Sequence, residues 1–319
     1  MSVALCLNRP ASASAAAMGR SITLGTRGSP LALAQAHSVA AALEAAHGWP
    51  GGTVVIRTIR TSGDKIQDRP LAEVGGKALW TKELDLALLG GESDLSVHSM
   101  KDVEGERPET LVIAAMMERA DVRDRLIGAR SIEALPEGGT VGTSSPRRAA
   151  QLLHWRPDLH IEPIRGNVQT RLDKIARGEA DATMLAAAGL DRLGIEAGAP
   201  VPIEAMLPAP GQAAIGIECR ADDDEVRALL AAIDHRSTRR AVEIERAFSR
   251  ALGANCHSPV AAFADILPDG GVRLRAEILS SDGRERIAEV RIVTGEAEAA
   301  ALGREMLGRA GAPTRALFE

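Results

Sequence analysis

The sequence predicts an α/β protein with two similar doubly wound domains and a small α+β third domain. Two patterns that recur in the same order along the chain predict the duplication. A Gly-Thr pair followed by Ser-Pro occurs at residues 25–30 and again at residues 142–146. A helix end, a Gly-Glu-x-Asp turn and a strand occur at residues 84–96 and again at residues 172–183. Alternation of strands and helices is typical of α/β domains, and two such domains leave a ligand cleft between them.

The pattern changes after about residue 233, where the third domain is expected to begin. Residues 237–252 predict an amphipathic helix, because their apolar side chains fall on one helical face. Three strands and a final Ala-rich helix after Thr294 are expected to follow, the strands at residues 259–266, 272–279 and 286–293. At the other end, residues 1–20 are expected to be a disordered extension, unless Met18 is the true start.

Composition excludes several classes of function. The chain has 319 residues, more than one typical domain of ~100–200 residues. Aromatic residues make up only 2% of it, which argues against base-stacking platforms for single-stranded nucleic acid. The net charge of −5 argues against a general binder of polyanions. There is no apolar run of about 18 residues, so no membrane span is expected.

The three cysteines, Cys6, Cys219 and Cys256, are too few and too scattered for a disulfide framework or a zinc site. Reduced thiols in the cytoplasm fit best, and no metal is expected. Cys256 lies in a loop of small residues between a helix and a strand, where it is expected to be accessible. A nucleophilic pair with His257 is only weakly indicated, and a lone cysteine is also often a small buried apolar residue.

Predicted helix starts with neighbouring cations are the most informative pattern. Ser29 and Ser145 are expected to be N-caps followed by proline, and Asn167 is expected to cap a third helix. A fourth helix is expected after Gly75 and Gly76. Helix N-termini favour anions, and arginine binds carboxylates in a bidentate manner. A ligand with many carboxylates or phosphates is therefore expected near the cations Arg27, Lys77, Arg147, Arg148, Arg165 and Arg171.

Residues 96–102 read as a half-buried strand that runs into a polar turn ending in Lys101 and Asp102. Ends of strands in open α/β sheets face the binding crevice. Asp102 is therefore a candidate general acid or base, or a group that stabilises a cation, although an ordinary ion pair in a loop would have the same spacing. No P-loop or dinucleotide fingerprint occurs.

Taken together, these motifs resemble the porphobilinogen deaminase family along nearly the whole chain from residue 21. The matching runs include Val97-His98-Ser99-Met100-Lys101-Asp102-Val103, Arg165-Gly166-Asn167-Val168 and the loop around Cys256. The resemblance implies two domains similar to periplasmic binding proteins and a third that carries the cofactor cysteine. The implied boundaries are residues 21–116 with 213–233 for domain 1, 117–212 for domain 2 and 234–319 for domain 3.

The resemblance also implies the reaction. Four porphobilinogens are condensed head to tail with release of ammonia, in tetrapyrrole biosynthesis, by a cytoplasmic monomer without nucleic acid or membrane partners. A dipyrromethane cofactor is held by a thioether, here to Cys256, and Asp102 is the catalytic carboxylate. The remaining cofactor contacts are implied to be Lys77, Ser99, Lys101, Thr143, Ser144, Ser145, Arg147, Arg148, Arg165 and Gly166. The implied substrate contacts are Arg27, Ser29, Arg171, Arg192 and Gln212.

Glu104 and Glu73 are among the positions that depart from the family pattern. Glu104 stands where proline is common, which puts the rigidity of the Asp102 loop in question, and Glu73 replaces a common lysine. Two alternative functions remain open on the residues alone. One is an anion-binding protein without catalysis, which would leave Cys256 unused, and the other is a thiol enzyme that uses Cys256 with His257.

Overall fold

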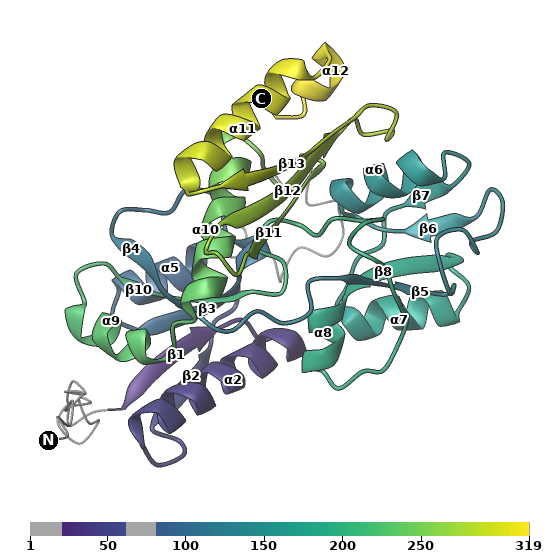
Figure 1. The fold of residues 1–319 in the computed structure, drawn as a ribbon. Helices are drawn as coiled ribbons and strands as arrows, with labels where there is room; N and C mark the ends of the chain where they lie inside the picture. Colours follow the sequence, from purple (N-terminus) through teal and green to yellow (C-terminus); the bar gives the residue numbers. More distant parts are fainter. Residues whose placement is uncertain (1–20, 62–80, 319) are drawn as a thin grey trace, which may run out of the picture.

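The computed structural model describes residues 21–61 and 81–318. The predictions for residues 1–20, for Glu73, for Lys77 and for the helix start after Gly75 and Gly76 lie outside the described residues. Three sheets organise the described chain (Figure 1). The chain is an α/β protein with two mixed five-stranded sheets and a smaller antiparallel C-terminal domain, which confirms the predicted fold class.

The first sheet has the strand order β2-β1-β3-β10-β4, in which β10 alone runs antiparallel to its neighbours. Its strands are β1 (Ile22–Thr26), β2 (Val54–Thr58), β3 (Leu95–Ser99), β4 (Leu111–Met116) and β10 (Ile215–Arg220). The helices of this first lobe are α2 (Pro30–His47), α5 (Lys82–Leu89) and α9 (Asp224–Leu230), with the short 3₁₀ helices η1 (Met100–Asp102) and η2 (Ala231–Ile233). The chain thus leaves this sheet after β4 and returns to it with β10.

The second sheet repeats this plan with the order β7-β6-β8-β5-β9, and β5 is its antiparallel counterpart of β10. Its strands are β5 (Asp124–Ile127), β6 (Thr140–Gly142), β7 (His160–Glu162), β8 (Ala182–Ala186) and β9 (Ala199–Pro200). The helices of this second lobe are α6 (Pro146–Trp155), α7 (Val168–Ala176) and α8 (Ala187–Arg192). The predicted duplication is therefore confirmed strand by strand.

The predicted caps are also confirmed. The Ser29 hydroxyl accepts a hydrogen bond from the Ala32 amide, and the Ser145 hydroxyl accepts one from the Arg148 amide. The Asn167 side chain caps α7 through the Thr170 amide at 2.9 Å. Each cap satisfies an amide that the first helical turn leaves without a partner, which is why the chain turns into helix at these residues.

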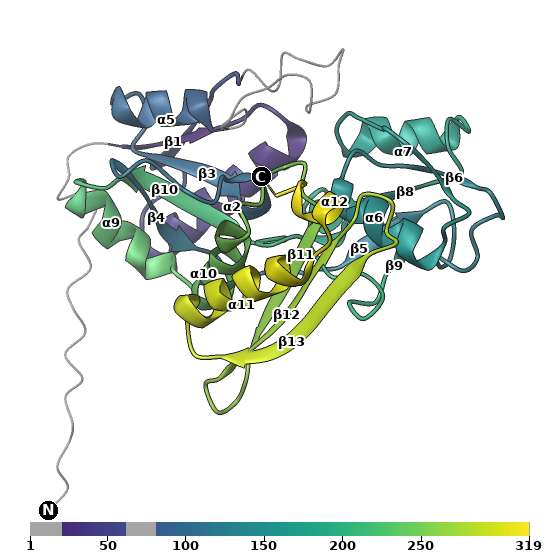
Figure 2. The same cartoon turned by 90° about the horizontal axis from the view of Figure 1, so that it is seen from above.

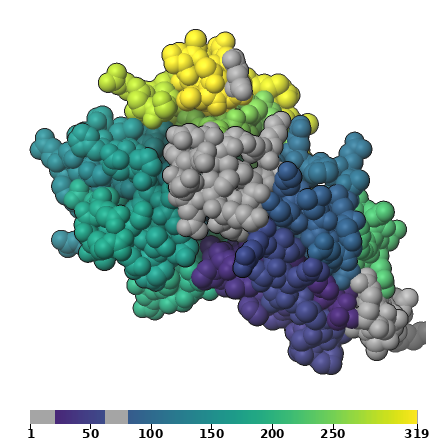
Figure 3. All heavy atoms as spheres, turned by 180° about the vertical axis from the view of Figure 1, so that it is seen from behind, coloured from purple at the N-terminus to yellow at the C-terminus, as the bar shows by residue number. Residues whose placement is uncertain are grey.

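The C-terminal domain lies over both lobes (Figures 1 and 2). The view from behind shows the same arrangement (Figure 3). It packs two helices on a three-stranded antiparallel sheet, and its predicted elements are confirmed to within a residue or two at their ends. They are α10 (Arg236–Ala251), β11 (Val260–Ile266), β12 (Val272–Leu279), β13 (Arg286–Val293) and α11 (Glu296–Arg309), followed by the short α12 (Ala312–Arg315).

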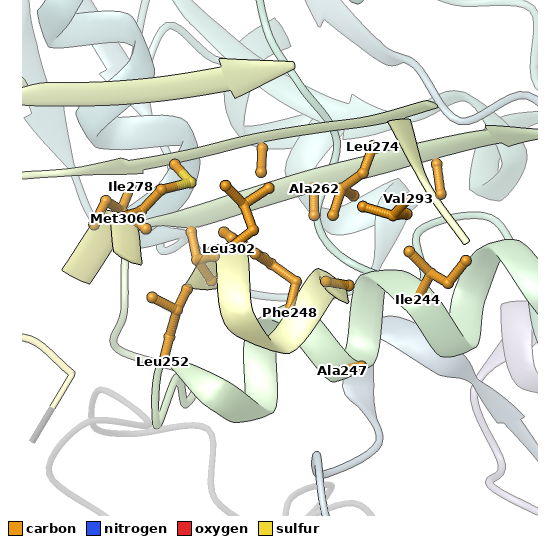
Figure 4. Packing of buried hydrophobic residues seen from close by; sticks show 14 of the residues in the cluster. Ile244, Ala247, Phe248, Leu252, Ala262, Leu274, Ile278, Val293, Leu302 and Met306 are labelled. Atoms are coloured by element: carbon orange, nitrogen blue, oxygen red, sulfur yellow. The ribbon is translucent and has the colours of Figure 1, made fainter. Parts of the chain in front are cut away.

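Aliphatic side chains, Met306 and two phenylalanines, Phe248 and Phe318, fill the core of this domain (Figure 4). Phe248 of α10 is fully buried and packs with Leu274, Ile278 and Leu302. A Cβ atom at Gly303 would lie only 2.8 Å from the carbonyl oxygen of Phe248, so glycine at this position permits α10 and α11 to approach closely. This packing fixes α10, the helix that leads directly into the Cys256 loop. Among the described residues, no helix is long and apolar enough to cross a membrane.

Candidate active site

Asp102 lies in the turn that follows the buried strand β3 of the first lobe. Four of the five residues of β3 are buried, and the chain then turns through η1, so that Lys101 and Asp102 are exposed. A small pocket lies beside this turn. Its lining includes the predicted residues Arg27, Ser99 and Asp102, together with Gln35, Thr81 and His98. The Ser99 hydroxyl bonds to the Gln35 side chain of α2, which ties the turn to the first helix.

Arg246 of α10 holds the turn from the other side. Its guanidinium donates to the carbonyl oxygens of Val103 at 3.0 Å and Glu104 at 2.5 Å, with longer contacts to those of Met100 and Gly105. Burial lowers the pKa of Arg246 to about 10, so the side chain remains charged at neutral pH. Arg246 was not among the residues predicted from the sequence. Arg246 could have been recognised because it is a charged side chain on the apolar face of an amphipathic helix, where a buried charge needs partners.

A buried ionic cluster underlies the same turn. Arg107 bonds to Glu218, Asp85 and Glu104, and Glu218 also bonds to His98 at 3.0 Å. Although burial alone would raise it, the bonds from His98 and Arg107 lower the pKa of Glu218 to about 2. At Asp85 burial prevails and raises the pKa of the carboxyl. The Glu104 carboxylate also accepts from the Thr81 hydroxyl, so Glu104 anchors the loop where proline is common in the family.

Arg171 of the second lobe interacts electrostatically with Asp102. Burial lowers the pKa of Arg171, on α7, to about 10, the charge of Arg148 acts in the same direction, and Asp102 opposes both. Lys101 is exposed to water yet enclosed by protein on most sides, and this enclosure lowers its pKa, while Asp102 opposes the shift. Arg165 also contributes charge at Arg171. Asp102 thus interacts electrostatically with Lys101 of its own turn and with Arg171 of the second lobe, and Arg171 interacts in turn with Arg165.

Arg147 and Arg148 have a different environment from the one predicted. Both are buried, with 4% and 6% of their surface exposed, and both pair with Asp124 of β5. Arg147 also donates to the Leu207 carbonyl at 2.7 Å, and Arg148 to the Met184 carbonyl at 2.9 Å. The two arginines hold the pKa of Asp124 well below its usual range despite its burial. Their guanidinium groups thus bond to groups of the protein interior.

Several other predicted residues also bond within the protein. Gln212 is fully buried and donates to the Val122 carbonyl and to Asp124. Arg192 donates to the Ala213 carbonyl at 2.6 Å. Thr143 is buried, and its hydroxyl accepts from the Ser145 amide. Ser144 is exposed and donates to the Ile164 carbonyl, while Gly166, with a φ of 115°, accepts from Arg171 at its carbonyl.

Cys256 is exposed, as predicted, on the loop between α10 and β11. Its Sγ lies 3.3 Å from Nε2 of His257. The other free cysteine of the described residues, Cys219, is buried in β10, and burial raises its pKa to about 11. Only Cys256 therefore offers an accessible thiol in this part of the chain. No cluster of metal-binding side chains occurs among the described residues.

Two family models match the chain in succession. The model "Porphobilinogen deaminase, dipyromethane cofactor binding domain" matches residues 22–228, and "Porphobilinogen deaminase, C-terminal domain" matches residues 239–309. Their boundary falls after β10 has completed the first sheet, between α9 and α10.

Individual relatives and solved structures are also similar to this chain. Porphobilinogen deaminase of Sphingopyxis alaskensis is 56% identical over 93% of this chain and 96% of its own length. That of Paracoccus denitrificans is 49% identical over 91% of this chain and 94% of its own length. Among solved structures, the VFT2 domain of BvgS from Bordetella pertussis has 16% identity and a TM-score of 0.39, covering 70% of this chain and 93% of that one. With both family models and these relatives covering nearly all of it, the chain belongs to the porphobilinogen deaminase family.

Proposed function

We propose that this chain is a hydroxymethylbilane synthase, which condenses four porphobilinogens head to tail and releases ammonia at each condensation. The observation that carries this proposal is the exposed Asp102 carboxylate, which follows Lys101 in the turn and interacts electrostatically with Arg171 of the second lobe. Porphobilinogen brings carboxylates and develops positive charge at its reacting methylene when ammonia leaves. A site for porphobilinogen needs fixed cations to bind its carboxylates and a fixed anion to stabilise the positive charge at its methylene. Lys101 and Arg171 supply the cations, and Asp102 supplies the anion.

The dipyrromethane cofactor is proposed to be attached through Cys256. The residues present fit such a group, because this thiol is exposed and Lys101, Arg165 and Arg171 offer charge for its carboxylates. When bound, the cofactor supplies the pyrrole carbon to which the first porphobilinogen is joined. An anion-binding protein without catalysis would leave Cys256 unmodified.

Asp102 is proposed to act on the substrate in two ways. As a carboxylate, it stabilises the cation that remains when ammonia leaves the aminomethyl group. It can also hold and release a proton at Oδ, as the departing amine and the coupled pyrroles require. Arg246 and the cluster of Arg107 with Glu218 keep the turn rigid, so the carboxylate need not reorganise as charge develops.

The predicted binding residues are proposed to divide into three groups. The first group contacts carboxylates of the cofactor or growing chain directly, and consists of Lys101, Arg165, Arg171, Arg27, Ser29, Ser99 and Lys77. Arg147, Arg148 and Gln212 support the site from the interior through Asp124. Thr143, Ser144, Ser145, Gly166 and Arg192 shape the backbone on the second lobe's side of the site.

We further propose the domain boundaries 21–116 with 213–233, 117–212 and 234–319. Membership of β10 in the first sheet and of β5 in the second supports them. The protein is proposed to act in the cytoplasm, since attachment at Cys256 needs a thiol that a reducing compartment preserves. It is also proposed to act as a monomer.

Intact mass spectrometry with peptide mapping tests the proposal. Purified protein should carry a covalent dipyrromethane on the peptide that contains Cys256 and none on the peptide that contains Cys219. The same preparation should consume porphobilinogen and release ammonia. Active protein with an unmodified Cys256 would overturn the proposal.

A further inference from the structure

We infer that His257 is the base that accepts the Cys256 thiol proton while the bond from sulfur to the cofactor forms. The inference rests on the proposed attachment at Cys256 and assigns a catalytic residue to that attachment. The imidazole touches the reacting atom, since Nε2 lies 3.3 Å from Sγ.

The loop holds the two side chains together. The Asn255 side chain accepts a hydrogen bond from the His257 amide at 2.8 Å. Ser258 closes the loop from the other side, because its hydroxyl donates to the Leu317 carbonyl at 2.7 Å. Neighbouring side chains on an extended backbone point apart, and this tight turn brings them to one side instead.

The thiol has need of a base. Partial burial raises the pKa of Cys256, and in the described part of the chain no charged side chain counters that effect. The loop also follows the C-terminus of α10, where the helix dipole is negative and gives a thiolate no support. A thiol in this setting is protonated at neutral pH, whereas the nucleophile is the thiolate. Imidazole is the side chain suited to take a proton near neutral pH.

The step balances without a redox partner. The proton on Sγ passes to Nε2 of His257, and the sulfur electron pair forms a C–S bond to the methylene carbon of an aminomethyl- or hydroxymethylpyrrole. The C–N or C–O bond of that methylene breaks, and the nitrogen or oxygen takes the bonding electron pair and one proton from solvent, so that it leaves as ammonia or water. His257 then returns its own proton to solvent. Porphobilinogen, the substrate, is itself such an aminomethylpyrrole.

Alkylation of the full-length apoprotein measures the proton transfer directly. Apoprotein is made in cells that cannot synthesise porphobilinogen, and its fold is checked by circular dichroism. Iodoacetamide modification of the Cys256 peptide is then followed by mass spectrometry from pH 5.5 to 9. His257→Gln keeps a hydrogen-bonding side chain but cannot accept a proton, so the rate near pH 7 should fall about tenfold or more. Added imidazole should restore part of the rate in His257→Ala.

His160→Gln is the matched control, because His160 is exposed on β7 in the second lobe. Its alkylation profile should match that of the unaltered chain. If His257→Gln also matches that profile, His257 is not the base and the inference is overturned.

Attachment itself is the second readout. Apoprotein is mixed with porphobilinogen, and the gain in mass is followed over time at pH 7. His257→Gln should gain the cofactor mass more slowly than the unaltered chain and His160→Gln. An equal rate would overturn the inference while leaving the proposed function intact. Failure of the unaltered chain to gain mass at Cys256 would instead overturn the proposed function, and with it the inference.

Discussion

Arg246 donates a 3.0 Å hydrogen bond to the carbonyl oxygen of Val103, and so ties α10 to the turn that ends in Asp102. The same helix runs on to Ala251 and into the Cys256 loop. One rigid element therefore connects the carboxylate proposed to act on the substrate with the thiol proposed to carry the cofactor. The position of α10 is fixed in turn by Phe248 and its neighbours in the C-terminal core.

Replacing Arg246 by Met should lower both stability and turnover. The carbonyls of residues 100–105 would lose their shared donor in a buried site, at a cost of about 2–4 kcal/mol in the free energy of unfolding. Because the turn would loosen, kcat should fall more than KM rises. Urea unfolding and steady-state kinetics measure the two effects. Arg250→Met is the control one turn later, since its ion pair with Glu296 is partly exposed and worth little. An unchanged kcat in Arg246→Met would remove Arg246 from this role.

Replacing Asp102 by Asn should abolish most turnover without unfolding the protein. The amide keeps the shape of the side chain but cannot stabilise a cation or exchange a proton, so kcat should fall by about 10²-fold or more. Since Asp102 is exposed, the unfolding midpoint should hardly move. Glu106→Gln, four residues further on and also exposed, is the control. Normal turnover by Asp102→Asn would exclude Asp102 as the catalytic carboxylate.

Local patterns in the sequence were sufficient to predict much of the fold. Helix caps at Ser29, Ser145 and Asn167 depend on residues three positions apart, and hydrophobic periodicity is equally local, so both could be recognised. The duplication was visible because both lobes use the same turn residues. The exposure of Cys256 followed from its loop of small residues.

The environment of the arginines could not be predicted in the same way. Arg147 and Arg148 follow a helix cap, as an anion-binding cation would, yet Asp124 engages both from a strand more than twenty positions earlier. An ion pair between residues so far apart in the chain produces no local pattern in a single sequence, so it could not be predicted. The charges of Glu245 and Arg246 on the buried face of α10 were a usable signal, because buried charges require partners.

Stability should depend on Glu218 at acidic pH. Folding lowers the pKa of this carboxyl from 4.5 to about 2, so its ionised form stabilises the fold fully above pH about 4.5 and loses that effect as the pH falls toward 2. Asp85, whose pKa is raised, acts in the opposite sense and offsets part of the loss. Between pH 5 and pH 3, Glu218→Gln should lose about 2 kcal/mol less of its unfolding free energy than the unaltered chain.

Urea unfolding at several pH values checks this difference in slope, even if Glu218→Gln is less stable throughout. Glu225→Gln, exposed at the start of α9, should keep the slope of the unaltered chain. Equal slopes in all three proteins would mean that Glu218 does not titrate with the cluster of His98 and Arg107.

Replacement of buried Arg148 and of half-buried Arg171 should affect stability and KM differently. Arg148→Met leaves Asp124 buried with one partner fewer, which should cost about 3–5 kcal/mol of unfolding free energy. Arg171→Met removes a half-buried cation that donates to the Gly166 carbonyl, so its cost in stability should be far smaller. Its effect should appear in KM, because a carboxylate of the bound chain would lose its partner. Urea unfolding and porphobilinogen kinetics on both variants measure this contrast. A stable Arg148→Met with a raised KM would show that Arg148 contacts the ligand after all, and would return it to the role that its place beside the Ser145 cap first suggested.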